Sequence, residues 1–342
     1  MEDRGESRDE AVRRHNAHAV LAVVLAVAAA LAAGWQVLER GYRGFPLIIS
    51  LSALLLLLLP YFLFGLTGLG DWLKRRLAQR PAAVVAFASL LLAPYLIYGP
   101  ATGAFSLRSL VVLAGFILLP TTLLLVARRA SGRPSRHDPG LFDALAVLAI
   151  WLPFDFRWMR QVWVWPQGMG SYIFNAVLAV DLAILLFVCL RGFEGVGYRF
   201  RLRRSDAAVI AVNFLVFAAI AIPLGMSIGF LEFHPRGSGL VDFVGTFTSI
   251  FLLIGIPEEL LFRGLIQNFL QQRLRREWLA LALAAVIFGA AHLNNGPFPN
   301  WRYFVLASIA GVFYGRAYRS SGGIAASACV HALVDTVWGK LF

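Results

Sequence analysis

The chain contains, at residues 45–68, the stretch FPLIISLSALLLLLLPYFLFGLTG, which carries no charged side chain. The hydrocarbon core of a bilayer is about 30 Å thick and is crossed by roughly 20 apolar helical residues, so this stretch predicts a transmembrane helix. The whole chain shares this character, because 59% of its 342 residues are hydrophobic and only 15% are charged. Soluble domains have about 25% charged residues. The composition therefore predicts an all-α, polytopic bundle of transmembrane helices.

Apolar windows of this length recur along the chain and predict about eleven spans. The predicted spans are residues 17–38, 45–68, 82–99, 109–127, 141–155, 172–190, 206–226, 240–262, 278–293, 301–318 and 323–339. The connecting segments alternate between rich and poor in Lys and Arg, with 22 in one set and 8 in the other. Because cytoplasmic segments carry more of these residues, the alternation places the N-terminal tail, residues 1–16, in the cytoplasm.

The formal net charge of +12 does not indicate nucleic-acid binding. The basic side chains lie between apolar stretches instead of forming one patch with interleaved aromatic residues. Cys189 and Cys329 fall inside apolar segments without CxxC spacing, so neither a disulfide framework nor a thiolate metal site is predicted. The predicted surroundings are the lipid bilayer. Arg far outnumbers Lys and the chain is rich in Ala and Leu, which favours the inner (cell) membrane of a GC-rich bacterium.

A basic run at residues 199–204 divides the predicted spans into two regions. Residues 17–204 form a six-span region of mostly Leu, Ala and Val, and the sequence indicates no role for it. Residues 205–342 form a second region in which ionisable side chains lie inside the spans. The chemistry of the protein is therefore expected in the last five spans.

Two features of the first region carry separate expectations. Trp151–Tyr172 contains four Trp, and because amphipathic aromatics prefer the headgroup layer, it predicts an outer loop on the membrane surface. Asp181 lies in the middle of a span. It contributes to a conduit or partner contact, or it is hydrogen-bonded to a neighbouring helix, with Asn213 as the candidate partner.

Six ionisable side chains fall within or at the ends of the last five spans. They are Glu258, Glu259, Arg263, His292, His331 and Asp335. A charged group inside a membrane costs about 2.5 kcal/mol or more, so such groups indicate function. A Glu–Arg pair alone is explained equally well as a clamp between helices. Six groups within 78 residues, at compatible spacings, favour a functional polar site.

Helical spacing sorts these groups. Glu259 and Arg263 are four residues apart and can pair, which leaves Glu258, about 100° around the helix, as the freer carboxylate. His331 and Asp335 are also four apart, so the acid can bind one ring nitrogen and fix the other.

Depth in the membrane gives a second criterion. Glu258 precedes Arg273 by 15 residues and His292 follows Glu277 by 15, so an antiparallel hairpin puts both roughly 22 Å from its turn. Phe288 lies four before His292 and is expected to pack under it.

A carboxylate that faces two imidazoles inside a membrane can perform hydrolysis. Glu258 can deprotonate a water molecule, while His292 or His331 polarises the scissile carbonyl or holds the oxyanion. Alternatively, Glu258, His292 and His331 can bind a divalent metal such as zinc with an open position for water.

The three motifs together resemble the CAAX protease and bacteriocin-processing (CPBP, or Abi) family of intramembrane proteases. That family has a paired Glu with an Arg five after the first, a Phe with a His four later, and a His with an Asn or Asp four later. In this chain the pattern reads Glu258-Glu259-x-x-x-Arg263, Phe288-x-x-x-His292 and His331-x-x-x-Asp335. Order, residue type and spacing match, and the resemblance covers residues 205–342.

The resemblance implies an intramembrane endopeptidase in which Glu258 is the general base that activates water. Glu259 and Arg263 are implied to support it. His292 and His331 are implied to bind water or to stabilise the oxyanion.

Asp335 takes the family's fourth polar position. An ionised Asp cannot donate a hydrogen bond, so Asp335 suits a metal ligand, an orienting partner of His331 or a protonated donor. Metal dependence stays open, and on family grounds we favour the metal-independent glutamate mechanism.

The predicted substrate is a small or membrane-anchored polypeptide, and nothing in the sequence specifies a prenyl pocket. Two other functional classes of membrane protein are consistent with these buried ionisable side chains. A membrane transporter or proton-coupled carrier also contains buried Glu, His, Asp and Arg, but the sequence lacks the inverted repeat common in carriers. An inactive scaffold or immunity protein is the third class, and the intact motif set argues against it.

Overall fold

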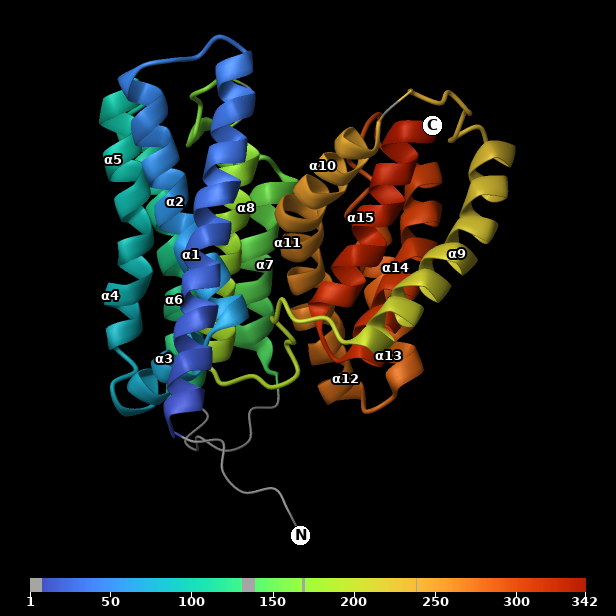
Figure 1. Cartoon of the computed structure of the whole chain (residues 1–342). Coiled ribbons are helices and arrows are strands. Elements are labelled where there is room, and N and C mark those ends of the chain that lie inside the picture. The colour runs from blue at the N-terminus through green and yellow to red at the C-terminus, as the bar shows by residue number, and fades with distance from the viewer. Residues whose placement is uncertain (1–7, 131–138, 168–169, 238) are drawn as a thin grey trace. The chain divides into compact units, whose positions relative to one another are not determined.

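The computed structural model describes residues 8–130, 139–167, 170–237 and 239–342 (Figure 1). Throughout these ranges the regular elements are helices, and no strand is present. Helices satisfy their backbone hydrogen bonds internally, as hydrocarbon requires. The predicted all-α class is therefore confirmed. The first helix begins at Arg8, within the predicted cytoplasmic tail, and residues 1–7 of that tail lie outside the described residues.

The chain divides into two compact units. One consists of Met1–Ser135 and Leu148–Phe193, and the other of Arg136–Val147 and Glu194–Phe342. One of the three boundaries between them, after Val147, falls within helix α7 (Leu141–Asp155). All three polar motifs lie in the second unit.

The first unit is built from long apolar helices and one short amphipathic helix, α3. Its elements are α1 (Arg8–Glu39), α2 (Phe45–Leu66), α3 (Leu69–Gln79), α4 (Ala83–Ser89), η1 (Leu90–Leu92), α5 (Ala93–Thr102), α6 (Leu107–Ala130), η2 (Trp158–Gln161), α8 (Gly170–Ala183) and η3 (Ile184–Leu190). The sequence analysis did not predict α3, because this segment is too short and too charged to cross a membrane.

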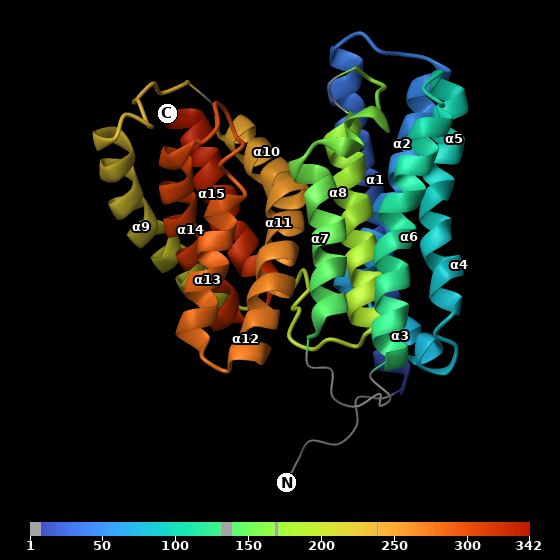
Figure 2. The ribbon, with the colours of Figure 1, turned by 180° about the vertical axis from the view of Figure 1, so that it is seen from behind.

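The second unit carries the polar motifs on three packed segments. Its elements are α9 (Arg204–Ser227), α10 (Leu240–Ile250), η4 (Phe251–Gly255), α11 (Ile256–Glu259), η5 (Leu260–Gln267), α12 (Asn268–Leu274), α13 (Glu277–Ala290), α14 (Trp301–Ser321) and α15 (Ile324–Leu341). Elements α10 to α12 form one continuous helical run, in which η4 and η5 have π-type hydrogen bonding. The predicted hairpin is confirmed, because α13 returns along α12 and packs on α14 (Figure 2).

Two residues set the course of the long helix. Pro257 lies in the first turn of α11, where hydrogen bonding changes from π to α type, so the chain continues without a break. Because proline has no amide hydrogen, one backbone hydrogen bond is missing at this point of the continuous run. Gly255 lies so close to α15 that a Cβ would be 3.1 Å from the Ala328 carbonyl oxygen. Its missing side chain lets the two helices approach.

Every predicted span coincides with a helix in the described ranges. In the part of the chain that the structure describes, seven helical segments are long and apolar enough to cross a membrane, among them Leu240–Leu274, and Glu277–Ala290 is a shorter apolar helix. The chain is thus an integral membrane protein of the helical class. The number of eleven spans stays a prediction.

The expected surface position of the Trp-rich segment is wrong for Trp163. Its side chain is 0% exposed, stacks on Phe174 with a ring-centroid distance of 4.5 Å and donates Nε1–H to Asn175 at 2.9 Å. Because Asn175 satisfies the indole N–H, the ring can be buried in the first unit. Trp158, by contrast, is 60% exposed.

The expected hydrogen bond of Asp181 to a neighbouring helix is also wrong. Its side chain is buried, and neither carboxylate oxygen has a hydrogen-bond partner among the described residues. The Asn213 amide donates instead to the Val209 carbonyl oxygen, one turn back in its own helix, at 2.8 Å. A role of Asp181 in a conduit stays a prediction.

Candidate active site

Three of the predicted site residues lie on one stretch of helix. Glu258 and Glu259 belong to α11, and Arg263 lies one turn later in η5. The side chains of Glu259 and Arg263 are 0% exposed, whereas that of Glu258 is 29% exposed. Adjacent helical residues point about 100° apart, so one carboxylate enters the packed interior and the other faces accessible space. Glu258 is therefore the freer carboxylate, as expected.

Glu259 connects three other side chains. Its Oε2 lies 3.0 Å from Arg263 Nε, so the predicted pair is confirmed. The same oxygen accepts a hydrogen bond from Ser327 Oγ, and Oε1 lies 2.9 Å from His331 Nδ1. A buried ion pair is stable only when further hydrogen bonds satisfy its charges, and Ser327 and His331 supply them for the Glu259 carboxylate.

His331 is held in one orientation by these contacts. An ionised carboxylate only accepts, so His331 Nδ1 carries the proton that it shares with Glu259. The Tyr314 ring stacks on the imidazole at 4.8 Å and 18°. His331 Nε2 consequently points toward Asp335 Oδ2, at 3.4 Å, and Glu258 Oε2, at 3.9 Å.

Asp335 contacts His331, as the four-residue spacing predicts, because its Oδ2 lies 3.4 Å from Nε2. The contact of Glu259 with the other ring nitrogen, Nδ1, was not predicted from the sequence. Glu259 and Asp335 therefore hold the imidazole from opposite sides, and Asp335 lies on the same side of the ring as Glu258.

His292 falls within the predicted span 278–293, but in the structure the helix α13 ends at Ala290 and His292 lies just beyond it, in a turn. Its Nδ1 is 2.8 Å from the Phe288 carbonyl oxygen, which only accepts, so Nδ1 carries a proton here too. In the neutral ring Nε2 is then an acceptor, suited to binding water. As predicted, Phe288 packs under His292, at 4.7 Å between ring centroids, and its ring lies 6.0 Å from that of His331.

Three side chains that contact the site residues were not predicted from the sequence. Ser327 bonds Glu259, Tyr314 stacks on His331, and Tyr303 packs against the His292 ring at 4.6 Å. Ser327 had a detectable signal, since it lies four residues before His331 on the same helical face. The two Tyr had none, because an aromatic residue in a membrane helix is unremarkable in sequence.

The residues suggested as metal ligands do not form a recognisable cation site. Within the described ranges no group of three or more His, Cys, Asp or Glu side chains is arranged to hold a metal ion. Nδ1 of both histidines is bound to oxygen, so Nε2 is the nitrogen that either ring could offer to a metal. The Nε2 of His331 lies 3.9 Å from Glu258 and 3.4 Å from Asp335. We derive no chemical step through a metal.

The fold and this cluster indicate the class of protein: a helical membrane protein with a buried site built from carboxylate, imidazole and guanidinium groups. Residues 240–337 match the family model described as type II CAAX prenyl endopeptidase Rce1-like. This part of the chain is therefore an Rce1-like domain, consistent with an intramembrane protease of the CPBP family. Neither the comparison with curated proteins nor that with solved structures gave a match.

Because the Glu259–Arg263 pair is buried, we expect replacement of Arg263 to lower the stability of the protein more than replacement of Arg319. Arg263→Ala leaves the Glu259 charge buried without its cation, so we expect the free energy of unfolding in detergent to fall by about 3–5 kcal/mol. Arg319 pairs with Glu277 at a position where both side chains are accessible, so Arg319→Ala is expected to cost at most about 1 kcal/mol. Equal and small losses in denaturant titrations of the two variants would contradict a buried pair.

Proposed function

We propose that the protein is an intramembrane endopeptidase in which Glu258 activates the water that hydrolyses the peptide bond. One observation carries the proposal. Glu258 is the accessible member of the carboxylate pair, and it lies 3.9 Å from a His331 Nε2 whose orientation Glu259 fixes. A base beside a fixed imidazole is suited to general acid–base catalysis.

The proposed reaction begins when Glu258 takes a proton from a water molecule that His292 Nε2 helps to hold. The resulting hydroxide attacks the carbonyl carbon, and the negative charge moves to the carbonyl oxygen. A His331 ring that carries both protons donates from Nε2 to this oxyanion. The C–N bond then breaks, and the proton on Glu258 moves to the departing amine. One water molecule is consumed, and a new carboxyl group and amine are formed.

The remaining polar residues position the reacting groups in this proposal. Glu259, with its charge balanced by Arg263 and a hydrogen bond from Ser327, keeps Nδ1 of His331 engaged. Asp335, at 3.4 Å from Nε2, stabilises the proton on that nitrogen during attack. Preorganised groups need not rearrange as charge develops, and this lowers the barrier.

The domain match implies a polypeptide substrate and a membrane environment. Within that class we propose a small or membrane-anchored polypeptide, cleaved in the inner membrane of a bacterium by a protein whose N-terminus is cytoplasmic. The 22-to-8 alternation of basic residues supports this orientation. No residue pattern supports a requirement for a prenyl group.

Replacing the base tests the proposal. Glu258→Gln keeps the shape but removes the basic oxygen, so processing is expected to fall by about 10²- to 10⁴-fold while the protein remains folded and inserted. The measurement compares the membrane peptidome of cells that produce the wild type, the variant or neither. Glu232→Gln, which changes a carboxylate that is 80% exposed, is the matched control and should process normally. Normal processing by Glu258→Gln would remove Glu258 from the mechanism and would favour a carrier or a scaffold.

Treatment with a chelator tests the prediction that cleavage requires no bound metal ion. Because the described His and carboxylate side chains form no three-ligand site, cleavage by the purified protein should persist after exhaustive treatment with a chelator. Activity that disappears on chelation and returns with Zn²⁺ would instead assign the water-activating role to a bound metal.

A further inference from the structure

Two buried polar side chains follow Glu259 at intervals of four residues along the same helix. Arg263 follows one turn later and Gln267 one turn after that, and both residues are 0% exposed. Within the described ranges Arg263 Nη1 and Nη2 and Gln267 Oε1 have no hydrogen-bond partner. The catalytic proposal uses none of these atoms.

None of the described residues provides a hydrogen-bond partner for these atoms. The Arg263 guanidinium lies over the Phe288 and Tyr314 rings, at 4.5 and 5.5 Å from their centroids, which leaves its N–H edge unsatisfied. Donors on Arg263 and an acceptor on Gln267 occur in consecutive turns of one helix. Buried water molecules commonly bridge such groups in native proteins, and each makes about three hydrogen bonds.

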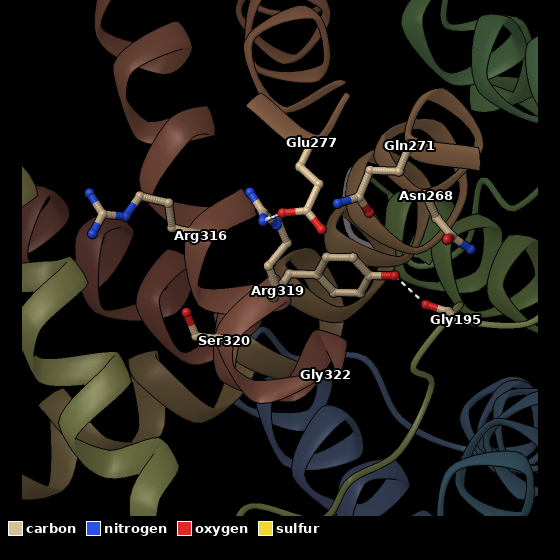
Figure 3. A pocket seen from close by; sticks show the side chains of 9 residues that line it. Gly195, Asn268, Gln271, Glu277, Arg316, Arg319, Ser320 and Gly322 are labelled. Carbon is tan, nitrogen blue, oxygen red and sulfur yellow. Dashed lines mark hydrogen bonds and ion pairs between the residues drawn. The ribbon is translucent and has the colours of Figure 1, made fainter. Parts of the chain in front are cut away.

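The same line of residues ends at a cavity. A pocket of about 500 Å³ lies where α12 and α13 join, at the end of the unit that the basic residues predict to be cytoplasmic. Figure 3 shows Gln271, one turn beyond Gln267, beside the Arg319–Glu277 ion pair in this pocket. Gln267 Nε2 donates to the Gly315 carbonyl oxygen at 3.2 Å, and the next residue, Arg316, also lines the pocket. Gln267 therefore lies one helical turn from the pocket residue Gln271 and one turn from Arg263 of the buried ion pair.

We propose that Arg263 and Gln267 hold a file of buried water molecules that joins this cavity to Glu259 and supplies the water consumed in catalysis. The path from Gln271 to Glu259 covers twelve residues, or about 18 Å. Hydrolysis consumes one water per cleavage, and a bound polypeptide covers the exposed side of Glu258. Water then has to reach the site from the buried side, which is where the unsatisfied atoms lie. The supply role rests on the proposed hydrolytic function, whereas the presence of the water does not.

Radiolytic labelling of the full-length protein in H₂¹⁸O tests the water file directly, because hydroxyl radicals formed from bound water modify the side chains beside it. Tyr314, which is 2% exposed and lies against Arg263, should be labelled. Tyr98, which is 0% exposed in the first unit, is the internal control and should not be. Labelling of Tyr314 at the level of Tyr98 in the wild type would overturn the proposal.

The supply role is tested with Gln267→Met, which keeps the length of the side chain and removes its polar atoms. Labelling of Tyr314 should fall to the level of Tyr98, and kcat should fall about tenfold or more with KM unchanged. Leu265→Met, at a buried position on the same helix, is the matched control for both measurements. Lost labelling with an unchanged kcat would overturn the supply role.

The two proposals fail separately. If Glu258→Gln processes normally, the endopeptidase mechanism fails, while the labelling of Tyr314 still decides whether the interior is hydrated. If Gln267→Met does not fold, the comparison of Tyr314 with Tyr98 in the wild type remains decisive.

Discussion

The Glu259 carboxylate is the interaction on which the candidate site depends. It is 0% exposed, and its two oxygens bind Arg263 and Ser327 on one side and His331 on the other. A carboxylate buried in a membrane protein is tolerated only when its charge is paired and its lone pairs are satisfied. These three partners meet that requirement together. Loss of any one of them leaves a charge unpaired or a lone pair without a hydrogen bond in an interior of low dielectric constant.

Local helix geometry makes this interaction possible. Gly255 permits the close approach of α15 to the long helix, and π-type segments flank α11 on both sides. Such segments shift the faces of a helix relative to an α-helical register, and they occur frequently at functional sites. Glu258 and Glu259, adjacent in α11, point about 100° apart and so face different surroundings. Two adjacent carboxylates thereby acquire different tasks: one stabilises an imidazole, and the other remains accessible to a substrate and to water.

The fold class, the helix positions and the Glu259–Arg263 pair could be predicted, because hydropathy and four-residue spacing are local properties of the chain. Contacts between helices could not. The partnership of Glu259 with His331 spans 72 residues and depends on which nitrogen the α15 backbone turns toward α11. The burial of Trp163, which lies in a loop, likewise depends on Asn175 in α8. Spacing along a helix shows which groups share a face, but not which helix that face will meet.

The protonation of His331 tests this account most directly. NMR spectra of the protein labelled with ¹⁵N in its six histidines, with the His331 signals identified from their loss in His331→Gln, show which ring nitrogen carries a proton. The account predicts a proton on Nδ1, hydrogen-bonded to Glu259 and altered in Glu259→Gln. A ring protonated on Nε2 alone would contradict it, because Glu259 would then not orient the imidazole toward Glu258.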